Sequence, residues 1–167
     1  FVCPLGGVCM RVYLDNCCYN RPFDEQAQLK VRLETVTKLA VQLLMATRVV
    51  EYVWPKALDY EISFNPFPKR KVSILWWKDG AAEYVETTEE IIRRGEEIER
   101  FGVKPKDALH IAIAAVEGMD YLVSWNFRHI TNAQMIPRIK KVCADSGYVC
   151  AEICTPQMLQ EEMQDEA

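Results

Sequence analysis

Histidine and glycine are scarce in this chain of 167 residues, which holds two histidines and seven glycines. A phosphate-binding loop needs closely spaced glycines, and the only adjacent pair, Gly6-Gly7, precedes every expected strand. The seven cysteines include no pair separated by two residues, which disfavours a structural zinc site. No apolar run approaches the roughly 18 residues that a bilayer span requires. We therefore expect no glycine-rich nucleotide loop, no zinc site and no membrane partner.

A surplus of basic residues is also missing, because 20 lysines and arginines face 24 aspartates and glutamates, for a net charge of −4. The last eight residues, QEEMQDEA, contribute four acids and no base, so the rest of the chain is neutral. A domain without net positive charge does not bind nucleic acid through its overall charge. Any contact with nucleic acid must therefore use a metal or a local basic patch. The odd cysteine count favours buried free thiols in a reducing cytoplasm.

The length of the chain predicts one domain with a sizeable core. Residues 1–9 lack the basic start of a signal peptide and are interpreted as an upstream extension or a cloning remnant, with Met10 as the natural start. The domain is expected over residues 10–159, and residues 160–167 are expected to form an acidic tail.

Strand-like and helix-like segments alternate along the whole domain. Strands are expected at about 12–14, 49–53, 82–86, 120–124 and 148–153. Helices are expected at about 25–46, 56–65, 66–80, 87–101, 105–118 and 137–146, with a last one from 155. This alternation predicts an α/β/α sandwich with a parallel sheet of about five strands. In such folds the functional site lies at the carboxyl ends of the strands.

Three acids stand in segments that are otherwise apolar. Asp15 ends the first strand, Glu61 lies in the helix after the second strand, and Asp107 lies in the first turn of the helix DALHIAIAA. A buried carboxylate is costly unless it is paired or binds a cation, and neither the first strand nor that helix core offers a lysine or arginine. Hard Mg²⁺ or Mn²⁺ would resolve the repulsion among the acids.

Each acid also has a simpler interpretation. Asp15 could cap the turn that follows it, and Asp107 sits near the positive end of a helix dipole, where an acid is favourable. Glu61 could face solvent, as Asp59 is expected to do. The order of the three acids along the strand–helix pattern is what favours a shared site.

The stretches YLDN, LDYEI, KPKDALHIA and DYLVSWNFRHI together resemble the PIN domain, a nuclease fold found in prokaryotic toxins of the VapC kind. The resemblance implies that Asp15, Glu61 and Asp107 hold Mg²⁺ or Mn²⁺ and that the protein hydrolyses RNA. A fourth catalytic position, often an acid in that family, is occupied here by Asn126, which adds no charge. Asn16 matches the small polar residue that follows the family's first acid, where it would orient the acid or the bound water.

The resemblance further implies RNA, an antitoxin protein and a second copy of the chain as partners. Arg21, Lys104 and Arg128 lie near the expected site and could hold an RNA backbone, with Asn16 beside them. The adjacent pair Trp76-Trp77 favours a homodimer, because two neighbouring tryptophans cannot easily face one core.

Three other functions stay open from the residues alone. A catalytically inactive PIN-fold module that binds a partner fits Asn126 and the neutral charge balance. Another doubly wound phosphate enzyme is disfavoured because the first strand is followed by DNC rather than D-x-D. A cysteine hydrolase would need His110 or His129 as the base for Cys17 or Cys18, which are expected to pack as small residues instead.

Overall fold

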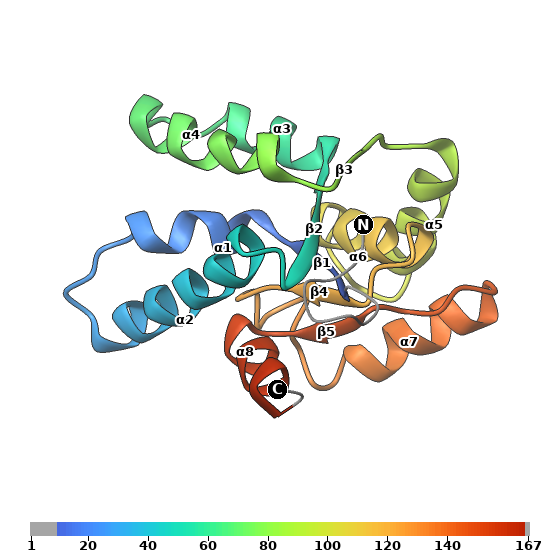
Figure 1. Ribbon diagram of the computed structural model, residues 1–167. Coiled ribbons are helices and arrows are strands. Elements are labelled where there is room, and N and C mark those ends of the chain that lie inside the picture. Colours follow the sequence, from blue (N-terminus) through green and yellow to red (C-terminus); the bar gives the residue numbers. More distant parts are fainter. Residues whose placement is uncertain (1–9, 166–167) are drawn as a thin grey trace.

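The structure, a computed structural model, describes residues 10–165 and contains a five-stranded sheet in which every pairing is parallel. The strands run in the spatial order β3-β2-β1-β4-β5 (Figure 1). The chain therefore adds β2 and β3 on one side of β1, and then β4 and β5 on the other side. They are β1 (Met10–Leu14), β2 (Val50–Pro55), β3 (Glu83–Val85), β4 (Tyr121–Val123) and β5 (Glu152–Cys154).

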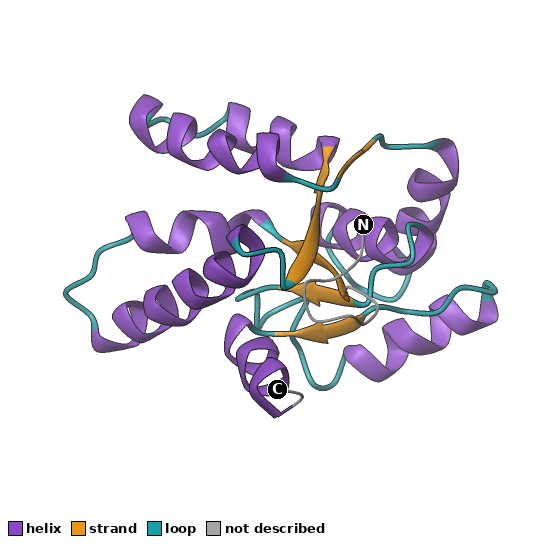
Figure 2. Ribbon diagram, viewed as in Figure 1, coloured by secondary structure: helices purple, strands orange, loops and turns teal. Residues whose placement is uncertain are grey.

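Helices flank the sheet on both sides, as Figure 2 shows, and the expected α/β/α sandwich is confirmed. One group lies to the left of the sheet in Figure 1: α1 (Asn16–Asn20), α2 (Leu29–Ala46) and α8 (Pro156–Asp165). The opposite group is α5 (Glu89–Glu99), α6 (Pro105–Val116) and α7 (Ile136–Asp145). Above them lie α3 (Lys56–Ser63) and α4 (Pro68–Leu75). Two short 3-10 helices, η1 (Arg21–Phe23) and η2 (Trp76–Gly80), directly follow α1 and α4 along the chain.

The central strand β1 sets the register of the sheet. Leu14 lies opposite Val123, so the residues that follow them, Asp15 and Ser124, leave the sheet side by side at its carboxyl edge. The Asp15 amide donates to the Val123 carbonyl at 3.0 Å, which extends this pairing by one step. The side chains of Val12, Tyr13 and Leu14 are completely buried, which explains why the strand reads as an unbroken apolar run.

The ends of several helices differ from the sequence prediction by a few residues. The helix expected from residue 25 begins only at Leu29, because Asp24 ends η1 and pairs with Arg21 at 3.1 Å. Thr88 rather than Thr87 caps α5, accepting from the Ile91 amide at 3.3 Å. The expected helix over 66–80 changes to a 3-10 turn at Trp76, and Gln160–Asp165 continue α8 through the segment assigned to the tail. Residues 1–9, the expected extension, and residues 166–167 lie outside the described part.

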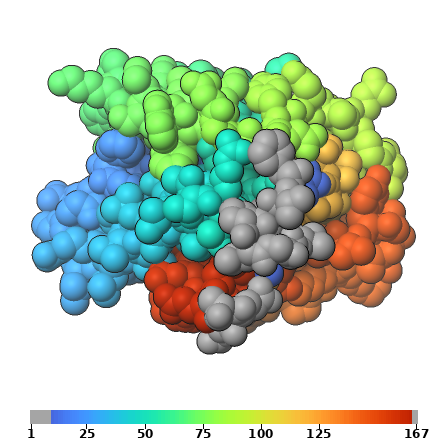
Figure 3. Space-filling model, viewed as in Figure 1, coloured from blue at the N-terminus to red at the C-terminus, as the bar shows by residue number. Residues whose placement is uncertain are grey.

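The helix α2 turns its apolar stripe to the surface. Leu29, Leu33, Val36 and Leu43 are between 59% and 67% exposed, whereas Lys38 on the opposite side is only 2% exposed. In Figure 3 this helix forms a continuous part of the surface on the left. Within residues 10–165, no helix is both long and apolar enough to span a bilayer.

Candidate active site

Asp15 lies at the carboxyl end of β1 with only 4% of its surface exposed. One carboxylate oxygen accepts from the Cys17 amide at 2.6 Å, which makes Asp15 the cap of α1. The other oxygen accepts from the Ser124 hydroxyl at 2.5 Å. The capping interpretation is therefore correct, but neither donor carries a charge. Within residues 10–165, no lysine, arginine or histidine forms an ion pair with Asp15.

Asp107 lies in the first turn of α6 and is 8% exposed. Its Oδ1 accepts from the Asn126 side-chain amide at 2.9 Å. The Asn126 backbone amide in turn donates to the Ser124 hydroxyl oxygen at 2.9 Å. A continuous hydrogen-bonded path thus runs from Asp15 through Ser124 and Asn126 to Asp107. The predicted residues Asp15, Asp107 and Asn126 are brought together by Ser124, which the sequence reasoning missed.

Glu61 occupies a different position, held by two residues of α6. Lys106 Nζ lies 2.9 Å from its Oε2, and His110 Nε2 lies 2.5 Å from its Oε1. The second ring nitrogen of His110 bonds the Tyr13 hydroxyl inside the core. The expectation that no basic residue pairs with these acids is wrong for Glu61, because Lys106 stands one residue before Asp107 and reaches across to α3.

Burial and ion pairing shift the pKa values of Glu61, His110 and Lys106 in opposite directions. Burial raises the pKa of Glu61, but the bonds from His110 and Lys106 outweigh it and leave the pKa below the ordinary value. Burial lowers the pKa of His110, and the bond to Glu61 more than compensates, so the pKa is raised. Burial likewise lowers the pKa of Lys106, while the charges of Glu61, Asp15 and Asp107 raise it, with a net increase. Lys106 therefore lies within electrostatic reach of all three acids.

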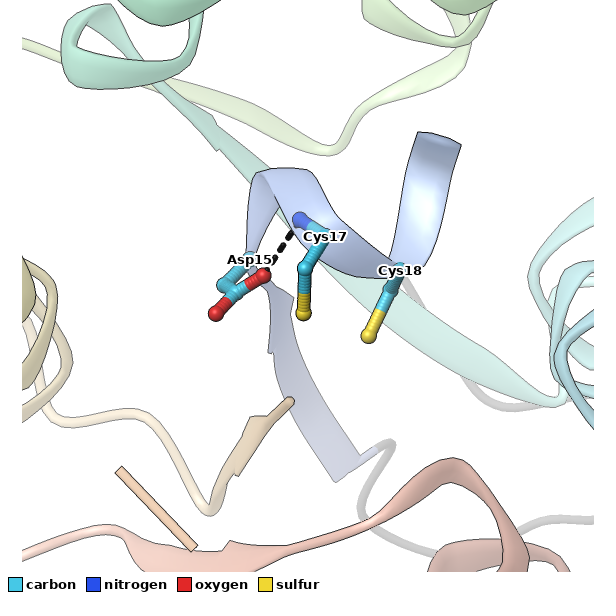
Figure 4. A group of neighbouring side chains, drawn as sticks. All are labelled: Asp15, Cys17 and Cys18. Carbon is cyan, nitrogen blue, oxygen red and sulfur yellow. Dashed lines mark hydrogen bonds between the residues drawn. The ribbon is translucent and has the colours of Figure 1, made fainter. Parts of the chain in front are cut away.

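Asp15, Cys17 and Cys18 form the group of possible metal ligands that the described residues contain, with ligand atoms within 4.8 Å of one another (Figure 4). The two thiols already have partners: Cys17 Sγ accepts from the Trp125 amide at 3.2 Å, and Cys18 Sγ donates to the Val123 carbonyl at 3.4 Å. Burial also raises the pKa of Cys18 well above the ordinary value, which keeps its thiol neutral. A hard cation prefers the carboxylate oxygens of Asp15 to these sulfurs.

The residues expected to contact RNA differ in whether their side chains already have partners within the protein. Arg21 is occupied by Glu34 at 3.0 Å and Asp24 at 3.1 Å, and Asn16 accepts from the Asn20 side chain at 2.8 Å rather than contacting Asp15. Lys104, which precedes α6, and Arg128, in the loop after β4, are both exposed.

Asp59, expected on the solvent side, is instead a structural residue. Its carboxylate accepts from the Trp54 indole at 2.9 Å, Lys78 at 2.6 Å and the Tyr84 hydroxyl at 3.0 Å. It lies two residues from Glu61, on another face of α3, so it cannot serve as a neutral control in mutagenesis.

No protein-family profile matches the sequence, and no curated protein matches it either. Among solved structures, the chain is similar to VapBC2 from Rickettsia felis, solved bound to a DNA fragment from the promoter. The two share 16% identity over 86% of this chain and 98% of the other, with a TM-score of 0.49. At this level of identity, no residue role passes from that protein to this one.

Proposed function

We propose that the protein is a metal-dependent endoribonuclease that hydrolyses phosphodiester bonds at the carboxyl edge of its sheet. The observation that carries the proposal is the pair Asp15 and Asp107. Both carboxylates are more than nine-tenths buried, both are joined through Ser124 and Asn126, and neither pairs with a lysine or arginine in the described chain. Buried acids without a direct ion pair at such an edge are favourable sites for a cation.

The donor set fits Mg²⁺ or Mn²⁺ at Asp15 and Asp107, whose oxygens are the ligands that hard cations prefer. Glu61 would join them by exchanging its contact with Lys106 for the cation. Asn126 is a positioning residue, because its amide nitrogen faces Asp107 while its oxygen accepts from the His129 amide at 3.2 Å. When bound, the ion supplies an activated water and neutralises charge on the phosphate.

Substrate binding is proposed to use the exposed cations around the acids and the exposed ring of Phe127, which packs beside the buried Trp125. Lys104 and Arg128 stand two residues from Lys106 and Asn126 respectively, where they can contact phosphates of single-stranded RNA. Trp125 and Phe127, with ring centroids 6.2 Å apart, line a hollow of about 430 Å³ next to Asn126. Aromatic rings beside such a groove are typical platforms for base stacking.

Cleavage of a fluorescently labelled single-stranded RNA, with Mn²⁺ and with a chelator, tests the proposal. Asp107→Asn should lower the rate by about 100-fold or more, since it removes a ligand and a charge. Asp79→Asn, at an exposed acid of η2, is the matched control and should cleave like the wild type. Equal cleavage by wild type and Asp107→Asn would remove the nuclease proposal.

The second candidate is an inactive PIN-fold module that binds a partner. The contact of Glu61 with Lys106 favours it, because this internal cation already compensates one acid without a metal. The two functions differ in two measurable properties, since a module of this kind would bind its partner with no Mn²⁺ uptake and no RNA cleavage.

The partners proposed from the sequence, an antitoxin protein and a second copy, fit two exposed apolar surfaces. One surface follows α3, α4 and η2, where Tyr60, Phe64, Phe67, Val72 and Trp76 are 55% to 70% exposed. We assign it to the homodimer, because Trp76 faces out while Trp77 packs against Tyr52. The stripe on α2 is assigned to a helical segment of an antitoxin.

Sedimentation of wild type and Trp76→Ser tests the homodimer. The wild type should sediment as a dimer and the variant as a monomer, because the tryptophan is 68% exposed in one copy and its replacement leaves the core intact. Ile92→Ser, at a 47% exposed residue of α5, is the matched control. A monomeric wild type would exclude this assembly.

A further inference from the structure

A second pocket, open to solvent on one side, lies away from the acids, between α1, η1, α2, α4 and η2. It measures about 160 Å³ and shares no residue with the acidic edge. Aromatic side chains of Tyr19, Phe23 and Trp77 form part of its wall, and Lys38 and Gln42 of α2 also line it. In Figure 1, α1, α2 and α4 lie on the left side of the molecule.

Lys38 is a buried amine without a counter-ion. It is 2% exposed, its nitrogen lies 5.6 Å from the centre of the Tyr19 ring, and no carboxylate within residues 10–165 pairs with it. The nearest acid along its helix, Glu34, is engaged by Arg21 at 3.0 Å and by Lys30 at 3.7 Å. Burying a charged amine in this way is costly unless an anion accompanies it.

Two further polar groups on the same cavity lack partners. The Tyr19 hydroxyl and the Gln42 side-chain nitrogen are buried and have no hydrogen-bond partner among the described residues, although their side chains are only 1% and 6% exposed. Buried polar groups are nearly always bonded, so groups left over around a cavity indicate a missing acceptor. All three groups can donate, and the cavity lining includes no acid.

We propose that this cavity binds a small organic carboxylate with an apolar body of about the size of a benzene ring. The carboxylate accepts from Lys38, Gln42 and the Tyr19 hydroxyl, and the apolar body packs against Phe23 and Trp77. The volume of about 160 Å³ is close to that of a cavity of about 150 Å³ that holds benzene. The site is independent of the proposed nuclease activity.

The protonation state of Lys38 supports this chemistry. Burial lowers the pKa of Lys38 to about 7, so the amine is partly neutral without a ligand. The titratable groups that face it, Cys18 and Tyr19 of α1, are kept neutral because burial raises the pKa of each well above its ordinary value. A bound carboxylate would place a negative charge beside the amine and would hold it protonated.

Titration with sodium benzoate, followed by calorimetry and by amide chemical shifts, tests the proposal on the full chain. Wild type should show saturable binding, with shifts confined to α1, α2 and α4. Benzamide has the same shape without the charge, and acetate has the charge without the ring, so both should bind at least about tenfold more weakly. Lys38→Met should weaken benzoate binding by at least about tenfold, and Lys30→Met, at the exposed lysine of the same helix, should leave it unchanged.

Gln42→Leu is a second variant that retains Lys38 and should also weaken benzoate binding. It keeps the test decisive if Lys38→Met fails to fold. Absence of benzoate binding to wild type at millimolar concentration would overturn the proposal and leave a water-filled cavity. Equal affinity for benzoate and benzamide, or unchanged affinity in both variants, would overturn it as well.

Discussion

The Ser124 hydroxyl donates to the Asp15 carboxylate over 2.5 Å and accepts from the Asn126 backbone amide at 2.9 Å. This one oxygen connects the ends of β1 and β4, which are neighbours in the sheet. Through Asn126 it also fixes the position of Asp107 in α6. The acids are therefore placed by the sheet and by a buried hydroxyl, so their geometry does not depend on the conformation of a free loop.

Ser124→Ala should disturb both acids at once. It leaves a buried carboxylate oxygen of Asp15 without its donor, which should lower the free energy of unfolding by about 1–3 kcal/mol. The affinity for Mn²⁺ should fall by about 10- to 100-fold, as expected for loss of a group that orients a ligand. Urea denaturation and calorimetry measure the two effects. Ser63→Ala, at an exposed hydroxyl of α3, is the control, and unchanged Mn²⁺ affinity in Ser124→Ala would contradict the positioning role.

Lys106→Met should have opposite effects on metal affinity and on stability without metal. The substitution frees Glu61 and removes a positive charge that acts on all three acids, so Mn²⁺ should bind up to about tenfold more tightly. Without metal, the melting temperature should fall because the acids lose their internal cation. Lys69→Met, at an exposed lysine of α4, should change neither property. Weaker Mn²⁺ binding in Lys106→Met would mean that Lys106 orients Glu61 for the ion.

The alternation of strands and helices was predictable because buried strands and capped helices leave strong local patterns. Gly102 and Gly118, both with positive φ, lie three and two residues after the ends of α5 and α6, close to where the sequence predicted the helix ends. The orientation of α2 was not predictable in the same way. Apolar residues occupy both of its sides, and the side that packs inward carries Lys38 beside Val41 and Met45.

The candidate acids stand out in the sequence because each interrupts an apolar segment. Their partners do not, because Lys106 and His110 meet Glu61 only after α3 and α6 pack across a long stretch of chain. Ser124 carried a weaker signal, since it directly follows β4 at the same edge as Asp15. Its hydroxyl gave no local pattern to distinguish it from an ordinary strand end.

Gly95→Ala should stabilise the protein. Gly95 lies inside α5 where the helix packs against α6, and a Cβ there would approach Leu109 Cα no closer than 3.7 Å, an ordinary contact. The gain in helix propensity is about 1 kcal/mol. Gly102→Ala should instead destabilise, because Gly102 has φ +91°. Thermal unfolding of both variants measures the effects, and a loss of stability in Gly95→Ala would mean that the interface cannot accept a methyl group.

Lys38 should make the stability of the protein rise with pH above neutrality. The pKa of Lys38 is lowered to about 7 in the folded state, so between that pH and about 10.4 the unfolded chain binds the extra proton. From pH 7 to pH 9 this adds about 2 kcal/mol to the free energy of unfolding. The rise should disappear in Lys38→Met and persist in Lys30→Met. Urea denaturation measures the effect. An equal change in the free energy of unfolding from pH 7 to pH 9 in wild type and in Lys38→Met would contradict the prediction.

Direct Mn²⁺ binding, followed by electron paramagnetic resonance, tests the central claim that Asp15 and Asp107 form a cation site. Wild type should take up the ion, and Asp15→Asn should lose at least about 100-fold in affinity, because the claim makes Asp15 a direct ligand. Asp79→Asn, which removes an exposed acid of η2, should bind Mn²⁺ like the wild type. Equal Mn²⁺ affinity in wild type, Asp15→Asn and Asp79→Asn would contradict the claim.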